Sequence, residues 1–312
     1  MRDGSVHASA AALVRATPVV FVLIWSTGFV VARLGMPHAQ PLTFLMFRYG
    51  LSALLFALWV RAAGVAWPQG RRQWLHLGVV GTLIQAGYLG GVWCAVKAGL
   101  GAGLVALIVG LQPVLTALWV NSRGDGSKGV QRVLPLQWLG LALGLSGLLL
   151  VVWQKLHVGE AHVHTVALAA FALLSITVGT LYQKRWVQAC DVRSANTVQM
   201  LSAFAVTLPL ALLEPWQLDA HPDLFIALAW SVLVLTLGGS SLLSLLIQRG
   251  AATAVTSLMY LVPPTTAVMA WWLFNETLTT TVFAGMALTA AGVALVVRQT
   301  RSAAPVLKEQ TP

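Results

Sequence analysis

The residues best able to bind a small molecule are polar or aromatic side chains inside long apolar segments. Arg48 is the most unusual of them, because a charge inside such a segment costs at least about 2.5 kcal/mol unless it meets water or a polar partner. Its guanidinium could hold a carboxylate from a cavity wall, or the side chain could extend to the nearby segment end. Gln85 and Tyr88 lie three residues apart and would share a helix face. These residue types suit a small amphipathic ligand.

The other candidate binding residues are Trp25, Gln112, Ser244 and Tyr260. Trp25 lies near the middle of its apolar segment and could form a cavity wall, although packing against lipid or other helices is an equal alternative. Ser244 could equally serve close helix packing. We expect the aromatic candidates to contact an apolar part of a substrate, and the two glutamines and Arg48 to contact its polar end.

Three prolines inside apolar segments, Pro113, Pro263 and Pro264, are candidates for gating. A proline in a helix leaves the carbonyl four residues earlier without its usual donor, and that carbonyl then needs another partner or a water-lined cavity. Pro113 and Pro263 occupy matching places in the two halves of the chain. We expect kinks there, in helices that surround a central site.

The sequence contains no pattern typical of catalysis or of metal binding. It has no phosphate loop, no HExxH motif and no cysteine-rich motif, and its two cysteines, Cys94 and Cys190, cannot build a disulfide framework. His157, His162 and His164 form a loose group that we expect to be solvated. We predict no catalytic residues, no cofactor, no metal and no enzyme activity. A membrane enzyme or assembly factor is the alternative from another class, and no catalytic cluster supports it.

The composition predicts the elements that would position these side chains. The chain has 312 residues, of which 58% are hydrophobic and 9% charged, and its mean hydropathy is +0.80. A soluble domain carries about 25% charged residues, so a soluble enzyme, a disordered chain and a secreted disulfide scaffold are excluded. The sequence indicates an all-α polytopic membrane protein with ten transmembrane helices, each near the roughly 20 residues that cross a bilayer. The predicted spans are 18–35, 41–60, 74–96, 101–120, 136–153, 166–183, 195–213, 224–247, 251–274 and 281–297.

The distribution of lysine and arginine predicts the orientation of these spans. Basic residues in short loops stay cytoplasmic, and apart from Arg48 within its span, only Arg33, Lys97 and Lys155 fall on the side opposite the termini. We therefore expect both termini to be cytoplasmic and the multi-pass chain to lie in the cytoplasmic (inner) membrane. Orientation explains the net charge of +10, so we expect no nucleic-acid partner. The expected partners are the lipid bilayer and a small-molecule substrate, with the chain a monomer or weak homo-oligomer.

Tryptophan placement agrees with this map. Amphipathic indole rings prefer the headgroup level of a membrane. Several tryptophans fall at predicted span ends, namely Trp59, Trp74, Trp93, Trp119, Trp138, Trp153, Trp271 and Trp272. We expect these rings to mark the two membrane interfaces.

A weak internal repeat divides the chain into two halves. Leu51-Ser52-Ala53 recurs as Leu201-Ser202-Ala203, and Leu111-Gln112-Pro113 resembles Leu261-Val262-Pro263. Since each half would hold five helices, the second half must enter the membrane inverted, which is how many secondary transporters are built. We expect repeats at 18–153 and 166–297, with cytoplasmic tails at 1–17 and 298–312. This architecture predicts transport by alternating access.

Several motifs also carry a family resemblance: Trp25-Ser-Thr-Gly-Phe-Val, Arg48-Tyr49, the stretch Gly99 to Trp119 with Pro113, and Asn275-Glu276-Thr-Leu running into Gly285-Met-Ala-Leu-Thr-Ala-Ala-Gly292. With them the chain resembles the drug/metabolite transporter superfamily, in its ten-helix branch with two EamA-like repeats. The first repeat departs from the pattern, because Asn121-Ser-Arg-Gly-Asp125 stands where an acid is expected. The resemblance implies export or exchange of small metabolites, commonly amino acids, with the aromatic amino-acid exporters as a neighbouring branch. A broad drug or nucleoside-type metabolite exporter is the alternative.

Overall fold

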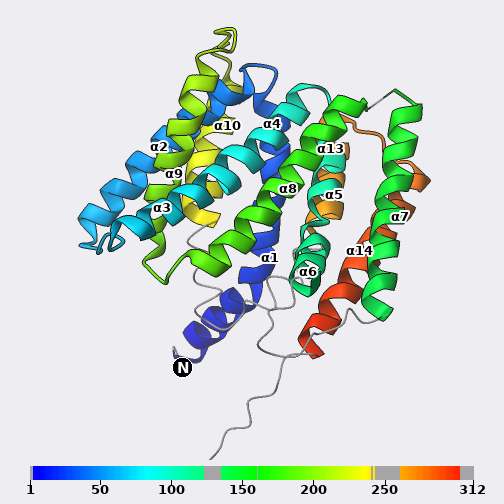
Figure 1. The fold of residues 1–312 in the computed structure, drawn as a ribbon, viewed down its shortest axis with the longest axis horizontal. Helices are drawn as coiled ribbons and strands as arrows, with labels where there is room; N and C mark the ends of the chain where they lie inside the picture. The colour runs from blue at the N-terminus through cyan, green and yellow to red at the C-terminus, as the bar shows by residue number, and fades with distance from the viewer. Residues whose placement is uncertain (1–2, 123–134, 160, 240–241, 243–260, 303–312) are drawn as a thin grey trace, which may run out of the picture.

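The structure, a computed structural model, describes residues 3–122, 135–159, 161–239, 242 and 261–302. Within these ranges the chain is helical, apart from an isolated β-bridge between Ala39 and Leu218. The elements, shown in Figure 1, are α1 (Asp3–Gly35), α2 (Pro41–Ala62), α3 (Arg71–Val80), η1 (Gly81–Leu89), α4 (Gly90–Lys97), α5 (Ala102–Val109), α6 (Gln112–Ser122), α7 (Pro135–His157), α8 (Val163–Trp186), α9 (Val192–Ala211), α10 (Pro222–Ala229), η2 (Trp230–Gly238), α13 (Val262–Phe274) and α14 (Thr280–Ser302).

Apolar helices dominate this part of the chain. By length and composition, four helical stretches in the described residues can cross a membrane: Pro41–Ala62, Arg71–Lys97, Trp138–His157 and Val163–Trp186. Shorter apolar helices occur at Val19–Gly35, Ala102–Thr116, Pro222–Gly238 and Thr280–Leu295. The predicted spans 224–247 and 251–274 run into residues 243–260, which lie outside the described residues. The all-helical, apolar character is that of a polytopic membrane protein, and the number of ten spans stays a prediction.

Two of the apolar stretches change from α-helical to π-helical geometry partway along. The π-helix η1 lies between α3 and α4, and η2 follows α10 directly; their first residues, Gly81 and Trp230, are 149 positions apart. A β-carbon at Gly81 would collide with the backbone of Gln199 in α9, so the close approach of these two elements requires glycine there. π-Helical segments inside α-helices are frequent at functional sites.

The predicted span 101–120 is interrupted at Gly110 and Leu111, where α5 ends and α6 begins. Pro113 has no N–H to donate to the carbonyl of Val109, the last residue of α5. The chain instead tightens, and the Leu111 N–H bonds the carbonyl of Ile108 at 3.2 Å. The break therefore lies within one turn of the proline.

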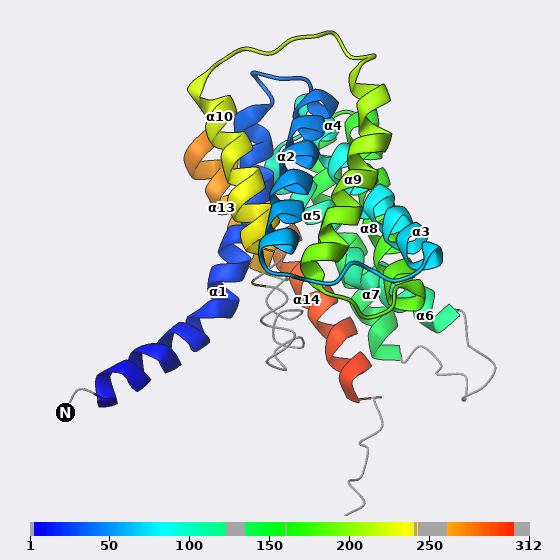
Figure 2. The ribbon, with the colours of Figure 1, turned by 90° about the vertical axis from the view of Figure 1, so that its left-hand side faces the viewer.

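The helices pack in pairs that join the two halves of the chain. α7 contacts α14, α2 contacts α9, and α5 contacts α13. In Figure 1 the pair α7 and α14 stands together at one edge of the bundle. Figure 2 shows that the N-terminal part of α1 extends beyond the bundle.

The tryptophans predicted at span ends fall into two groups. Trp93 is only 1% exposed, and its ring stacks on Phe44 with centroids 4.3 Å apart. The expectation of a membrane-interface ring is therefore wrong for Trp93, because the side of α4 that carries it is covered by α2. The other seven are exposed: Trp59, Trp74, Trp119, Trp138, Trp153, Trp271 and Trp272.

Two helices of the first half begin without a side-chain cap of their own, and glutamates from the second half cap them. Glu214 accepts the backbone N–H groups of Leu42 and Thr43, at 3.1 and 2.8 Å, at the start of α2. Glu276 accepts the N–H groups of Ala102 and Gly103, at 2.8 and 3.4 Å, at the start of α5. Negative charge is favourable at a helix N-terminus, so these contacts hold the halves together at one end of the bundle.

Candidate functional site

Arg48 is buried in α2, with 6% of its surface exposed, and points toward η2. Its Nε and Nη2 atoms donate to Thr236 Oγ1 at 3.3 and 3.2 Å. The Thr236 hydroxyl donates in turn to the carbonyl of Ser231, five residues back, at 2.8 Å. The π-helical turn thus uses the hydroxyl proton and leaves the oxygen to accept from Arg48. Among the described residues no carboxylate pairs with this guanidinium, and residues 240–260 contain no acid.

Two tyrosines and a serine lie on or near the same stretch of α2. The Tyr49 hydroxyl donates to the carbonyl of Gln85 in η1 at 2.7 Å, so α2 bonds to both π-helical segments through neighbouring residues. Tyr88, also in η1, is 6% exposed and lies within electrostatic range of Arg48. Ser52, one turn beyond Arg48, is buried, and its hydroxyl has no partner among the described residues.

The remaining polar candidates lie on elements around this group. The side chain of Gln85 is half-buried, and its amide bonds to no described residue. Gln112, at the start of α6, donates from Nε2 to Thr180 Oγ1 in α8 at 3.2 Å. Trp25 is half-buried in α1, with its ring 5.4 Å from that of Phe21. Arg48 and Tyr88 are both buried and within electrostatic range of each other, whereas Gln112 and Trp25 bond or pack to other partners.

The proline candidates lie where helices begin or break. Pro113 is the second residue of α6, while Pro263 and Pro264 open α13 directly after Val262. A β-carbon at Gly110 would lie 2.9 Å from Cγ of Pro263, so the break between α5 and α6 packs directly against the start of α13. Ser244 and Tyr260 lie outside the described residues.

Two cavities lie near the two ends of the bundle. One of about 300 Å³ is lined by charged groups that include Arg33, Lys155 and Glu276. Another of about 370 Å³ is lined by Arg72, Arg185 and other polar residues. None of the predicted substrate residues that the structure describes lines either cavity. A role of the predicted residues in substrate binding stays a prediction.

Thr236, the hydrogen-bond partner of Arg48, was not among the residues predicted from the sequence. Its only signal is that Thr236 and Ser231 are the polar side chains of the stretch Trp230–Gly238. The capping by Glu214 and Glu276 was also missed, because each acid bonds backbone groups more than 170 positions away.

Comparisons with a family profile and with known proteins both identify transporters. The profile described as EamA-like transporter family matches this chain twice, at residues 16–153 and 164–298. A protein of Salmonella typhimurium named probable amino-acid metabolite efflux pump is 26% identical over 289 residues, covering 88% of this chain and 91% of its own length.

Further relatives are named only as transporters. An uncharacterized transporter of Archaeoglobus fulgidus is 24% identical and covers 88% of this chain and 93% of its own. The uncharacterized inner membrane transporter YedA of Escherichia coli is 24% identical over 82% of this chain and 81% of its own. A solved structure, described only as a crystal structure of a protein, superposes with a TM-score of 0.61 at 16% identity, covering 91% of this chain and 97% of its own. At that identity the likeness concerns the fold alone.

Proposed function

The chain belongs to the EamA-like transporter family, and on that premise we propose that it is a secondary transporter that exports or exchanges small metabolites. The proposed substrates are amino acids with apolar or aromatic side chains, bound midway through the membrane and moved by alternating access. The name of the Salmonella typhimurium relative, a probable amino-acid metabolite efflux pump, supports this substrate class.

The observation that carries the proposal is Arg48, a buried cation that bonds a hydroxyl and, among the described residues, no carboxylate. A guanidinium has five N–H donors that match a carboxylate geometrically, and two of the Arg48 nitrogens share one acceptor. A substrate carboxylate would supply the missing counter-charge. Tyr88, beside Arg48, and Trp25 would contact the apolar part of the substrate.

The proposed mechanism, alternating access, rests on two related halves that we propose form an inverted repeat. The family profile matches once in each half, and the π-helices η1 and η2 are offset by nearly the same interval as the sequence repeat. The pairs α2–α9 and α7–α14 each join an element to the counterpart that the sequence repeat predicts. Two related halves can exchange conformations around a shared site, which would open it to each side in turn.

Membrane setting and orientation belong to the same proposal. The apolar helices and the inner-membrane name of the Escherichia coli relative support a multi-pass protein of the cytoplasmic membrane. The bias of lysine and arginine toward one side supports cytoplasmic termini. A small-molecule substrate follows from transport, and no enzyme activity is proposed.

The test is exchange of radiolabelled aromatic amino acids in proteoliposomes that contain the purified protein, with unlabelled competitors. We expect the free amino acid to compete and its methyl ester, which lacks the carboxylate charge, to compete about 10- to 100-fold more weakly, since a hydrogen bond to a charged group is worth about 1.5–3 kcal/mol. Arg48→Met should abolish this discrimination and most of the exchange.

Arg48→Met also separates a binding role from a structural one. A buried charge without an ionic partner is costly, and an apolar side chain in its place is not, so we expect an unchanged or higher melting temperature. Arg61→Met, at the exposed end of the same helix, is the matched control and should exchange like wild type. Competition by nucleosides alone would favour the alternative substrate class, and absence of exchange for every solute by folded protein would refute the transporter proposal.

A further inference from the structure

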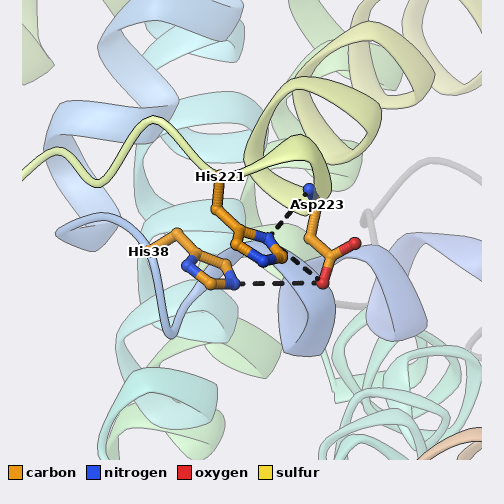
Figure 3. Close-up of side chains that lie close together, drawn as sticks. All are labelled: His38, His221 and Asp223. Carbon is orange, nitrogen blue, oxygen red and sulfur yellow. Dashed lines mark hydrogen bonds and ion pairs between the residues drawn. The ribbon is translucent and has the colours of Figure 1, made fainter.

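Two histidines and two aspartates gather at the end of the bundle where the α1–α2 link meets the start of α10. His38 belongs to that link, Asp219 and His221 precede α10, and Asp223 lies in its first turn. Figure 3 shows the rings of His38 and His221 lying against each other, beside the carboxylate of Asp223. The Asp219 N–H donates to the carbonyl of His38 at 2.9 Å, which fixes the two segments together.

The hydrogen bonds define which nitrogens carry protons. His38 Nδ1 lies 3.0 Å from Asp219 Oδ2, and the imidazole must donate because an ionised carboxylate only accepts. In the neutral ring this leaves a lone pair on His38 Nε2. His221 Nδ1 accepts the backbone N–H of Asp223 at 3.2 Å, so this nitrogen is also unprotonated.

These acceptor atoms face one another. Asp223 Oδ2 lies 3.9 Å from His38 Nε2 and 3.5 Å from His221 Nδ1, both too long for ordinary hydrogen bonds. One ligand atom from each of these three residues lies within 4.8 Å of the others. Ligands on a tetrahedral zinc ion, with bonds of about 2.0–2.1 Å, are roughly 3.3–3.5 Å apart. The two measured distances are at or slightly above that separation, so a small inward movement of the side chains would let the three atoms share one small cation.

We propose that His38, His221 and Asp223 bind a divalent transition-metal ion of the zinc class. A set of two imidazoles and a carboxylate favours zinc over magnesium or calcium, which prefer oxygen ligands. Asp219 would act as a positioning residue, because metal-binding histidines usually donate their other N–H to a carboxylate. The rings are stacked with centroids 4.1 Å apart and nearly parallel, and the lone pair of His221 Nδ1 accepts the Asp223 N–H, so binding requires one ring to turn out of the stack and His221 to exchange that hydrogen bond for the ion.

The ion would join the two halves of the chain. His38 comes from the link between α1 and α2, whereas His221 and Asp223 come from the second half. The segments already meet at the bridge between Ala39 and Leu218. Bound zinc would therefore stabilise this junction. The alternative to a metal ion is a proton on His38 Nε2, which would make His38 a cation between the carboxylates of Asp219 and Asp223.

The test uses full-length protein purified without a histidine tag, stripped with a chelator and titrated with zinc against a chromogenic zinc indicator. We expect about one zinc ion per chain and a higher melting temperature with zinc but not with magnesium. The double variant His38→Ala/His221→Ala should lose this ion. Asp219→Asn should weaken binding by about 10- to 100-fold, the usual effect of losing such a positioning group.

The matched control is His162→Ala/His164→Ala, which removes two histidines whose rings are also stacked, 5.6 Å apart, and exposed. This variant should bind zinc like wild type. Equal binding in both double variants, or no zinc on folded wild-type protein, would overturn the proposal in favour of the proton. If His38→Ala/His221→Ala does not fold, Asp223→Asn decides, since it keeps the backbone N–H for His221 and should still lose the ion.

Discussion

Most buried polar side chains in the described part of the chain bond to backbone carbonyls. The hydroxyls of Ser26 and Thr177 donate to the carbonyls four residues earlier, and Tyr49 donates to Gln85 across a helix contact. Such bonds remove the cost of a buried polar group. Arg48 differs, because its donors outnumber the acceptors that the described residues offer. Among these side chains, Arg48 is therefore the one best suited to an incoming ligand.

Glu276 gives a prediction at the scale of a single residue. Glu276→Gln keeps an acceptor for the N–H groups of Ala102 and Gly103 but removes the negative charge from the start of α5, so we expect a loss of about 0.3–1 kcal/mol of stability. Glu276→Ala removes both acceptors and should cost about 1–3 kcal/mol. Unfolding of the purified protein in detergent measures both changes.

The decisive result is the order of the two stabilities, with Glu276→Ala less stable than Glu276→Gln. The exposed His164→Ala serves as a control and should change stability by less than about 0.5 kcal/mol. If Glu276→Ala were as stable as wild type, the carboxylate would not cap α5 in the folded protein.

Sequence patterns found individual site residues better than their partners. A lone arginine in an apolar stretch is conspicuous, and Tyr88 is buried within electrostatic range of it, although a shared binding site stays a prediction. Thr236 could not be found, because one threonine in an apolar run has no distinct signal until the fold places it against Arg48. The cluster of His38 with His221 and Asp223 was missed for the same reason, since 183 positions separate His38 from His221.

Among the elements, the contact between α7 and α14 depends on the absence of side chains. A β-carbon at Gly292 would collide with the backbone of Gly140 and Gly144, and one at Gly285 would meet Val151 and the Gly147 carbonyl. Small residues let helix backbones approach closely, which is a principal source of packing energy between membrane helices.

Gly292→Ala tests this helix contact. The added methyl group meets backbone atoms that no side-chain rotation can move, so we expect the variant to lose at least about 1–3 kcal/mol. Gly28→Ala is the matched control, because its methyl group would meet only the Leu235 side chain at 3.8 Å. The control should match or exceed wild-type stability, as alanine favours a helix. Melting temperatures in detergent compare the two, and equal values would contradict the close contact.

The helical elements could largely be predicted, and their interruptions only in part. Apolar length indicated where α2, α7, α8 and α9 lie, because a bilayer imposes that length on each span. Pro113 predicted a disturbance that the structure places between α5 and α6. The π-helical geometry of η1 and η2 was not predicted, because apolar length does not distinguish it from α-helical geometry. Trp93 lay at a span end as predicted, yet tertiary packing buries it.

For the molecule as a whole, orientation in the membrane decides which of the two polar ends faces the cytoplasm. The cavity with Arg72 and Arg185 lies on the side that the basic residues predict to be cytoplasmic. The cavity with Glu276 and the cluster around His38 lie at ends predicted to face outward. Any metal effect would then depend on zinc outside the cell.

Cys190 offers a direct test of that orientation. It lies in the link between α8 and α9, is half-buried, and is free, as is Cys94. In a Cys94→Ser variant, Cys190 is the single remaining thiol. We expect a membrane-impermeant maleimide to label it in inside-out vesicles and not in intact cells. Val158→Cys in the same background places a second thiol at an exposed site in the link after α7, which should be labelled in intact cells.

The pH dependence of labelling adds an internal check. Burial raises the pKa of the Cys190 thiol, and the hydrogen bond from Gln73 lowers it less than burial raises it. Since the thiolate is the reactive form, labelling in inside-out vesicles should be slower than for free cysteine at neutral pH and should increase as the pH rises. Labelling of Cys190 in intact cells would reverse the orientation, and would place the His38 cluster on the cytoplasmic side.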